Sequence, residues 1–167
     1  WFALSERVVK LPLAFIGQSV AQVYLGEAAK LALSDRKALQ RLFRKTTRQL
    51  LLIGVIPLGL IVTIAPWLFR IVFGQEWATA GSYVQVLALM YLFRFVMMPL
   101  SQTLNVLERQ DLQLLWDAVR VSLVCTAFFL AHFLGWSALN AILVYGVAMS
   151  LSYAVLYAMS LRVLYQN

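Results

Sequence analysis

Long apolar segments alternate with short polar turns along almost the whole chain. Each segment is at least as long as the roughly 20 apolar residues that a helix needs to cross the hydrocarbon core of a bilayer. Backbone groups inside a bilayer must bond within their own segment, so spans of this kind form helices. The pattern predicts an all-α, polytopic transmembrane helical bundle, a single membrane domain over residues 1–167. Its expected helices are 2–25, 50–73, 82–106, 112–134 and 138–164.

The composition supports a membrane protein. Hydrophobic residues make up 62% of the chain and charged residues 13%, against about 25% charged in soluble domains. Trp1 opens a stretch that already has the character of a span, so we expect the chain to be part of a longer protein. The single cysteine, Cys125, excludes a disulfide within the chain and a cysteine-based metal cluster.

The segment 30–49 is the polar exception and is strongly basic. Ser34 is a candidate N-cap for a short amphipathic helix, in which Leu39, Leu42 and Phe43 form one face. We expect this helix to lie in the plane of the membrane surface and to contact lipid headgroups. Because the positive charge of the chain is concentrated here, we do not expect nucleic-acid binding. The membrane-surface candidates are Arg36, Lys37, Arg41, Arg44, Lys45 and Arg48.

Lys and Arg are retained in cytoplasmic loops, so segment 30–49 is predicted to face the cytoplasm. Alternation of the spans then places the turn 74–81 outside, the turn 108–111 inside and the turn 135–137 outside. The C-terminus is accordingly expected in the cytoplasm.

The first span carries a polar stripe. Arg7, Lys10, Gln18 and Gln22 recur at spacings close to helical turns, which gathers them on one side of a helix. A polar stripe on a span is expected to face a bundle interior or an aqueous cavity, because lipid cannot solvate it.

Arg94 lies near the middle of the span 82–106, too far from either end to reach water by extending its side chain. Burying this charge costs at least about 2.5–3.5 kcal/mol, so Arg94 should face water, a carboxylate or an anionic ligand. Two interpretations stay open: a structural pair with an acid on a neighbouring helix, and contact with substrate.

Asp117 and Arg120 are three residues apart on one predicted helix and close enough to pair. Alternatively, Asp117 takes up a coupling cation or proton while Arg120 attracts an anionic headgroup. The chain has no nucleophile with a base at recognisable spacing, no phosphate-binding glycine loop and no metal-ligand pattern. We therefore expect no enzyme, no metal and no cofactor.

Three stretches resemble the oligosaccharide-lipid flippases of the multidrug, oligosaccharidyl-lipid and polysaccharide exporter superfamily, particularly the O-antigen and capsule-type transporters of bacteria. They are ERVVKLPLAFIGQSVAQVYL at 6–25, APWLFRIVFGQEWATAG at 65–81 and PLSQTLNVLERQDLQLLWD at 99–117. The resemblance implies a fold of twelve helices in two lobes, of which this chain corresponds to helices eight to twelve. An N-terminal lobe of the same protein would then be a partner.

The resemblance also implies a function. Such a transporter flips lipid-linked oligosaccharide across the bacterial inner membrane for the biosynthesis of O-antigen, lipopolysaccharide or related surface polysaccharides. A polysaccharide polymerase and a chain-length regulator would be further partners. The implied coupling-ion residue is Asp117, and the implied cavity for pyrophosphate and sugars is lined by Arg94, Arg7, Lys10, Arg120, Gln18 and Gln22.

Two alternatives remain. A cation-coupled multidrug exporter of the same fold would favour acidic residues in its cavity, whereas the basic residues of the spans outnumber Asp117 and Glu27. A noncatalytic membrane subunit could instead hold glycan-assembly enzymes through the basic segment.

Overall fold

A computed structural model describes residues 2–166, apart from the side chains of residues 4, 5 and 12. The chain forms only helices over this range, which confirms the all-α prediction. Five of these helices are long and apolar enough to cross a membrane, which fits the predicted polytopic bundle. The elements are α1 (Phe2–Ser34), α2 (Arg36–Phe73), the 3₁₀ helix η1 (Gln75–Trp77), α3 (Ala78–Leu100), α4 (Gln102–Val106), α5 (Gln110–Phe133) and α6 (Ala138–Tyr165).

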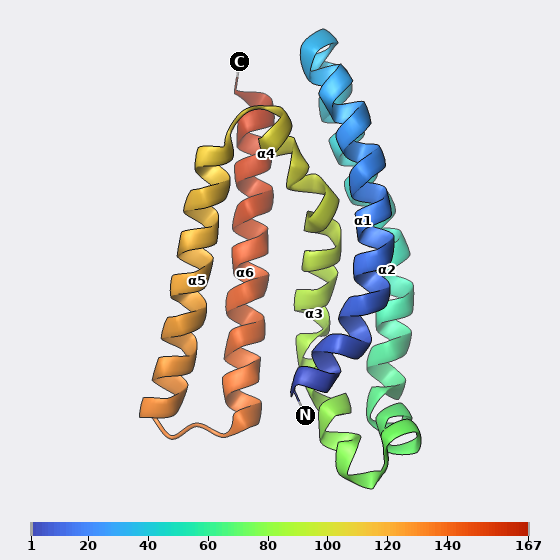
Figure 1. The fold of residues 1–167 in the computed structure, drawn as a ribbon, viewed down its shortest axis with the longest axis vertical. Helices are drawn as coiled ribbons and strands as arrows, with labels where there is room; N and C mark the ends of the chain where they lie inside the picture. Colours follow the sequence, from blue (N-terminus) through green and yellow to red (C-terminus); the bar gives the residue numbers. More distant parts are fainter. Residues whose placement is uncertain (1, 167) are drawn as a thin grey trace.

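Helix α3 is the centre of the bundle (Figure 1). It packs against α1 and α2 on one side and against α6 on the other. Helix α5 packs on the far side of α6, and within residues 2–166 it makes no packing contact with α1. The bundle therefore has an open flank between α1 and α5.

The contact between α2 and α3 is close because small residues lie in it. A Cβ atom placed on Gly81 would overlap the Cα atom of Pro66, so the two backbones touch at this point. Further along α3, three side chains are almost fully buried: Leu87, Met90 and Tyr91. Close approach through small residues is how helices pack tightly in lipid, where apolar burial alone gives little driving force.

The structure corrects the prediction for segment 30–49. Helix α1 continues to Ser34 instead of ending at residue 25, and α2 runs without interruption from Arg36 to Phe73. Asp35, rather than Ser34, is the N-cap, since its carboxylate accepts a hydrogen bond of 2.9 Å from the Ala38 amide. The basic segment is therefore the start of a long spanning helix, not a separate in-plane helix.

Packing explains this difference. Leu39 and Phe43, which were expected to lie on lipid, are fully buried in the protein, and Thr46 and Leu50 continue the same buried stripe. An apolar face that packs on the bundle has no reason to turn into the membrane plane.

The other boundaries differ by smaller amounts. Helix α3 begins at Ala78, within the predicted turn 74–81, and the predicted span 82–106 is divided at Ser101 into α3 and α4. Helix α2 continues through Pro57 and Pro66, which both lie inside it.

The turns lie at two ends (Figure 1). One end of the bundle holds the connection between α1 and α2, the turn between α4 and α5, and the end of α6. We call it the basic end. The start of α1, η1 and the connection between α5 and α6 lie at the opposite end. This arrangement agrees with the predicted alternation of the turns.

Candidate functional site

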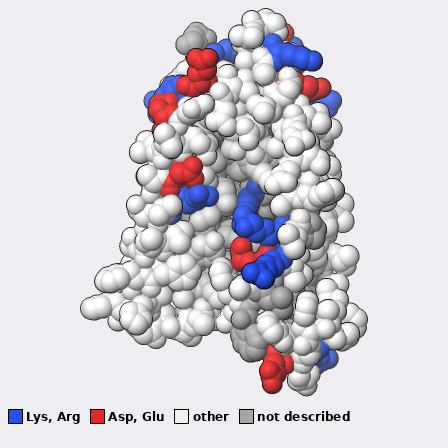
Figure 2. Space-filling model, viewed as in Figure 1, with Lys and Arg blue, Asp and Glu red and all other residues white. Residues whose placement is uncertain are grey.

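A cavity of about 360 Å³ opens between α1, α3, α5 and α6. A second cavity of about 360 Å³ adjoins it and shares Lys10, Arg94, Arg120 and Tyr153. We call the two together the central cleft. Figure 2 shows acidic and basic side chains gathered in a hollow midway along this face, well away from the charged residues at the two ends. Three predicted cations, from three different helices, thus meet at one place.

The position of the central cleft follows from the helix arrangement. Because α1 and α5 do not pack on each other, the space between them stays open, with α3 and α6 behind it. Charged groups at this depth need water, a partner or a ligand, and the open space can provide them.

Arg94 has an acidic partner that the sequence pattern did not reveal. Its Nη1 atom lies 3.8 Å from Oε2 of Glu6 on α1, with 35% of the Arg94 side chain and 19% of the Glu6 side chain exposed. Among the described residues no other ion pair or hydrogen bond engages this guanidinium, which has five donors. Arg94 is therefore paired with an acid on a neighbouring helix and is also open to the cleft.

Arg120 is held more firmly. Its Nη2 atom donates a 2.7 Å hydrogen bond to Oδ1 of Asp117, and its guanidinium carbon lies 4.5 Å from the centre of the Trp116 ring. Trp116 is fixed in turn by a 2.8 Å hydrogen bond from its Nε1 atom to the carbonyl oxygen of Ser152. Of the two interpretations of Asp117, the geometry realises the ion pair with Arg120.

Lys10 lines both cavities, and no ion pair holds its ammonium within the described part of the chain. The lining of the central cleft thus combines three cations, Lys10, Arg94 and Arg120, with the carboxylate of Glu6, while Asp117 pairs with Arg120 from outside the lining. The charge that remains for a ligand is positive.

Gln18 lines the first cavity, and Gln22 lines a neighbouring space of about 210 Å³ that Gln18 shares. These amides extend the polar surface of the cleft along α1 toward the basic end.

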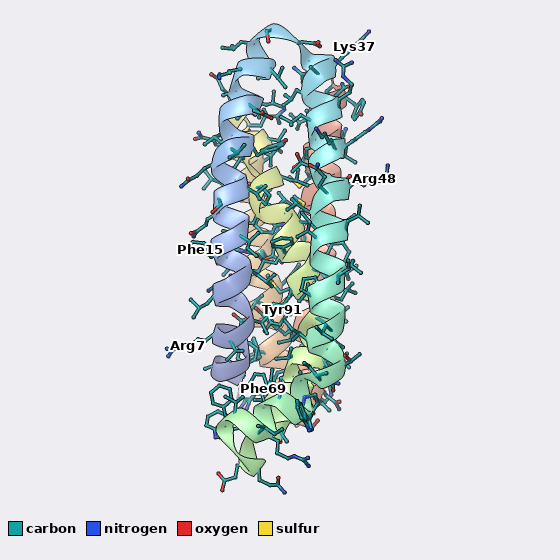
Figure 3. All side chains as sticks on the ribbon, turned by 90° about the vertical axis from the view of Figure 1, so that its right-hand side faces the viewer. Arg7, Phe15, Lys37, Arg48, Phe69 and Tyr91 are labelled. Carbon is teal, nitrogen blue, oxygen red and sulfur yellow. The ribbon has the colours of Figure 1, made fainter. Side chains whose placement is uncertain are left out.

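Arg7, unlike Gln22, lines neither the central cleft nor the space beside it, so the structure does not bring this predicted cavity residue to the site. Its side chain is exposed and points away from the bundle (Figure 3). Successive residues of an α-helix are about 100° apart, so Arg7 cannot share the inward direction of Glu6. The neighbouring Glu6 takes the inward position, and Lys10, one turn later, follows it.

Three buried polar atoms at or beside the cleft have no hydrogen-bond partner among the described residues: Oε1 of Glu6, the hydroxyl of Tyr91 and Oε1 of Gln113. Tyr91 lies in the interior of the bundle in Figure 3. Such atoms are costly unless water or a ligand bonds them. Spacing could have identified two of these residues, since Glu6 is four residues before Lys10 and Gln113 is seven residues before Arg120.

The predicted membrane-surface residues lie at the basic end, and Figure 3 shows Lys37 and Arg48 projecting outward from α2. Two of the six also fasten α2 to α6. Arg36 donates from Nη2 to the carbonyl oxygens of Val163, at 2.7 Å, and Gln166, at 2.8 Å. The guanidinium carbon of Arg44 lies 5.3 Å from the centre of the Tyr165 ring.

Comparison with protein families connects the chain to polysaccharide biosynthesis. Residues 1–82, which include Glu6, Lys10 and Gln18 of the cleft, match the family model described as "Polysaccharide biosynthesis protein". No curated protein and no solved structure matches the chain. With five helices of membrane-spanning length in its described part, the chain is a helical membrane protein that over residues 1–82 is similar to the polysaccharide biosynthesis proteins.

Proposed function

We propose that this chain is part of a membrane transporter that flips lipid-linked oligosaccharide across the bacterial inner membrane for cell-surface polysaccharide biosynthesis. The observation that carries the proposal is the meeting of Lys10, Arg94 and Arg120 at one open cleft midway along the bundle. The family match over residues 1–82 supports a role in polysaccharide biosynthesis.

The chemistry of the central cleft suits a cargo with a diphosphate next to sugars. A guanidinium offers paired donors to phosphate oxygens, and an ammonium adds a compact charge. Arg94 and Lys10 are the available cations, whereas Arg120 is already bonded to Asp117. The amides of Gln18 and Gln113 and the hydroxyl of Tyr91 provide hydrogen-bonding groups for sugar hydroxyls.

The open flank between α1 and α5 gives the prenyl chain of such a cargo a route to remain in lipid. Exposed apolar side chains, including Phe15 of α1 and Leu114 of α5, provide apolar surface on the two helices that border it. The polar headgroup would then cross the membrane inside the protein while the apolar tail stays outside it.

In this proposal the basic end faces the cytoplasm, and the C-terminus lies there with it. The protein would work as a transporter, not as an enzyme, with an N-terminal lobe of the same protein completing the cavity. A polysaccharide polymerase and a chain-length regulator are the proposed downstream partners.

A multidrug exporter for cationic drugs is less well supported. Such a cargo needs free carboxylates in the cavity, yet Glu6 in the cleft lining and Asp117 beside it each have an arginine partner.

Cells depleted of the natural protein that contains this chain test the proposal. Lipid-linked oligosaccharide on the inner and outer leaflets and sensitivity to cationic drugs would be measured together. The proposal expects glycolipid to accumulate on the inner leaflet with unchanged drug sensitivity. A normal leaflet distribution with drug hypersensitivity would instead assign the protein to drug export.

A further inference from the structure

The ion pair between Glu6 and Arg94 places a carboxylate inside a cleft whose net charge attracts anions. For an anion-binding site this is a paradox, because a like charge next to the ligand weakens binding. Glu6 lines the second cavity together with Lys10, Arg94 and Arg120, so a ligand bound to these cations would lie beside its carboxylate.

The pair is also weakly made. The distance of 3.8 Å between Nη1 of Arg94 and Oε2 of Glu6 lies beyond that of a charge-assisted hydrogen bond. Oε1 of Glu6 is buried and has no hydrogen-bond partner in the part of the chain that the structure describes. The ion pair between Arg120 and Asp117 is much closer, since Nη2 of Arg120 donates a hydrogen bond of 2.7 Å to Oδ1 of Asp117. A ligand can therefore take Arg94 from Glu6 more easily than it can take Arg120 from Asp117.

The membrane itself supplies the competitor that makes such a carboxylate useful. Anionic phospholipids surround the protein, and basic pockets between spanning helices bind their headgroups. In the proposed transporter the flank between α1 and α5, which do not pack on each other, is the lipid route of the prenyl chain, so a singly charged phosphodiester could reach Lys10 and Arg94 by the same route. Unless a group in the cleft weakens their binding, these abundant phospholipids would occupy it.

We infer that Glu6 is a specificity-determining residue, which rejects singly charged phospholipids from the central cleft and admits a multiply charged diphosphate lipid. This inference rests on the proposed function. A single phosphodiester charge gains little when it replaces one carboxylate at Arg94 and must then lie beside that carboxylate. A diphosphate bonds Arg94 and Lys10 at once, and its extra charge outweighs the repulsion from Glu6. Specificity of this kind comes from a repulsive element as well as an attractive one.

The test uses the purified natural protein that contains this chain, with short-chain phosphatidylglycerol and farnesyl diphosphate as probes and short-chain phosphatidylcholine as the neutral reference. The wild-type protein should bind farnesyl diphosphate more than about tenfold more tightly than phosphatidylglycerol. Glu6→Gln, which keeps the size of the side chain and removes its charge, should tighten phosphatidylglycerol binding by about tenfold and farnesyl diphosphate binding by much less.

Two variants control the experiment. Glu76→Gln removes an exposed carboxylate at the opposite end and should keep the wild-type preference. Glu6→Asp keeps the charge and should keep most of the preference. If Glu6→Gln yields no folded protein, Glu6→Ala replaces it, and the wild-type preference remains a test by itself.

The outcomes separate the two claims. A wild-type protein that binds neither anionic probe better than phosphatidylcholine would overturn both the proposed function and the role of Glu6. A wild-type preference for the diphosphate that Glu6→Gln leaves unchanged would overturn the role of Glu6 alone. A wild-type protein that binds both anionic probes equally would also overturn it.

Discussion

The hydroxyl oxygen of Tyr24 lies 2.6 Å from Oγ1 of Thr103, a buried hydrogen bond that joins α1 to α4. Both residues are almost completely buried. The bond fixes α1 beside the break at Ser101, on the basic side of the central cleft. Because α1 carries Glu6, Lys10 and Gln18, its attachment here holds one wall of the cleft in position.

Tyr24→Phe should destabilise the protein by about 1–3 kcal/mol, since it leaves Oγ1 of Thr103 buried without its partner. The measurement is the free energy of unfolding in detergent. Tyr165→Phe is the matched control, because the Tyr165 side chain is exposed, and it should change stability little. Equal stability of the two variants would show that the Tyr24 bond does not fasten α1.

Gly81→Ala should destabilise the bundle by about 1–3 kcal/mol, because the new Cβ would meet the Pro66 backbone and force α2 and α3 apart. Gly26 is the matched control, since it lies within α1 and a Cβ atom added there would meet nothing within 4 Å. Gly26→Ala should stabilise the protein by about 0.5–1 kcal/mol through helix propensity. Thermal unfolding of both variants measures the contrast, and a Gly81→Ala protein as stable as wild type would contradict the close contact.

Arg36→Ala should loosen the end of α6, because the carbonyl oxygens of Val163 and Gln166 lose their donor. Hydrogen exchange in the last turn of α6 should become faster, while exchange in α3 stays unchanged. Lys37→Ala, at the exposed neighbouring residue, is the control and should leave both helices protected as in wild type. Equal protection of α6 in the two variants would show that the hydrogen bonds of Arg36 do not stabilise the end of α6.

Arg120→Gln should lower stability, because it strands the Asp117 carboxylate within a spanning helix. The double variant Asp117→Asn with Arg120→Gln should recover part of the loss, with a coupling energy of about 1 kcal/mol in a double-mutant cycle. Both side chains are partly exposed, so a larger value is not expected. Strictly additive effects would show that the two residues do not stabilise each other.

The sequence was sufficient to predict the fold class and to single out four polar residues that line the cleft, Lys10, Gln18, Arg94 and Arg120. Spans of apolar residues are a strong signal, since lipid allows the backbone few alternatives. Arg94, Lys10 and Gln18 stand out because polar groups within a span must face something other than lipid. Their meeting point between four helices required the structure, because the pattern of one helix does not say which other helix it faces.

The errors have physical causes. An apolar stripe beside basic residues has the same pattern whether it lies on lipid or packs on protein, so Leu39 and Phe43 did not reveal that α2 is continuous. Arg7 was predicted as a cavity residue because positive charge was expected there, and Glu6 was overlooked for the same reason. The two residues are neighbours on one helix, so their side chains point in different directions. Gln113 was not predicted because an uncharged amide near the end of a span gives a weaker signal than a charge, although its spacing of seven residues from Arg120 is close to two helical turns.

Transport by an Arg94→Gln protein shows whether the central cleft carries an anionic glycolipid. The natural protein would be reconstituted in vesicles with lipid-linked oligosaccharide, with Arg41→Gln as the control at an exposed arginine of the basic end. We expect Arg94→Gln to lower the rate at which glycolipid changes leaflet by at least about tenfold, whereas Arg41→Gln should transport as wild type does and both proteins should fold equally well. Unchanged transport by folded Arg94→Gln protein would contradict the claim that the central cleft carries an anionic glycolipid.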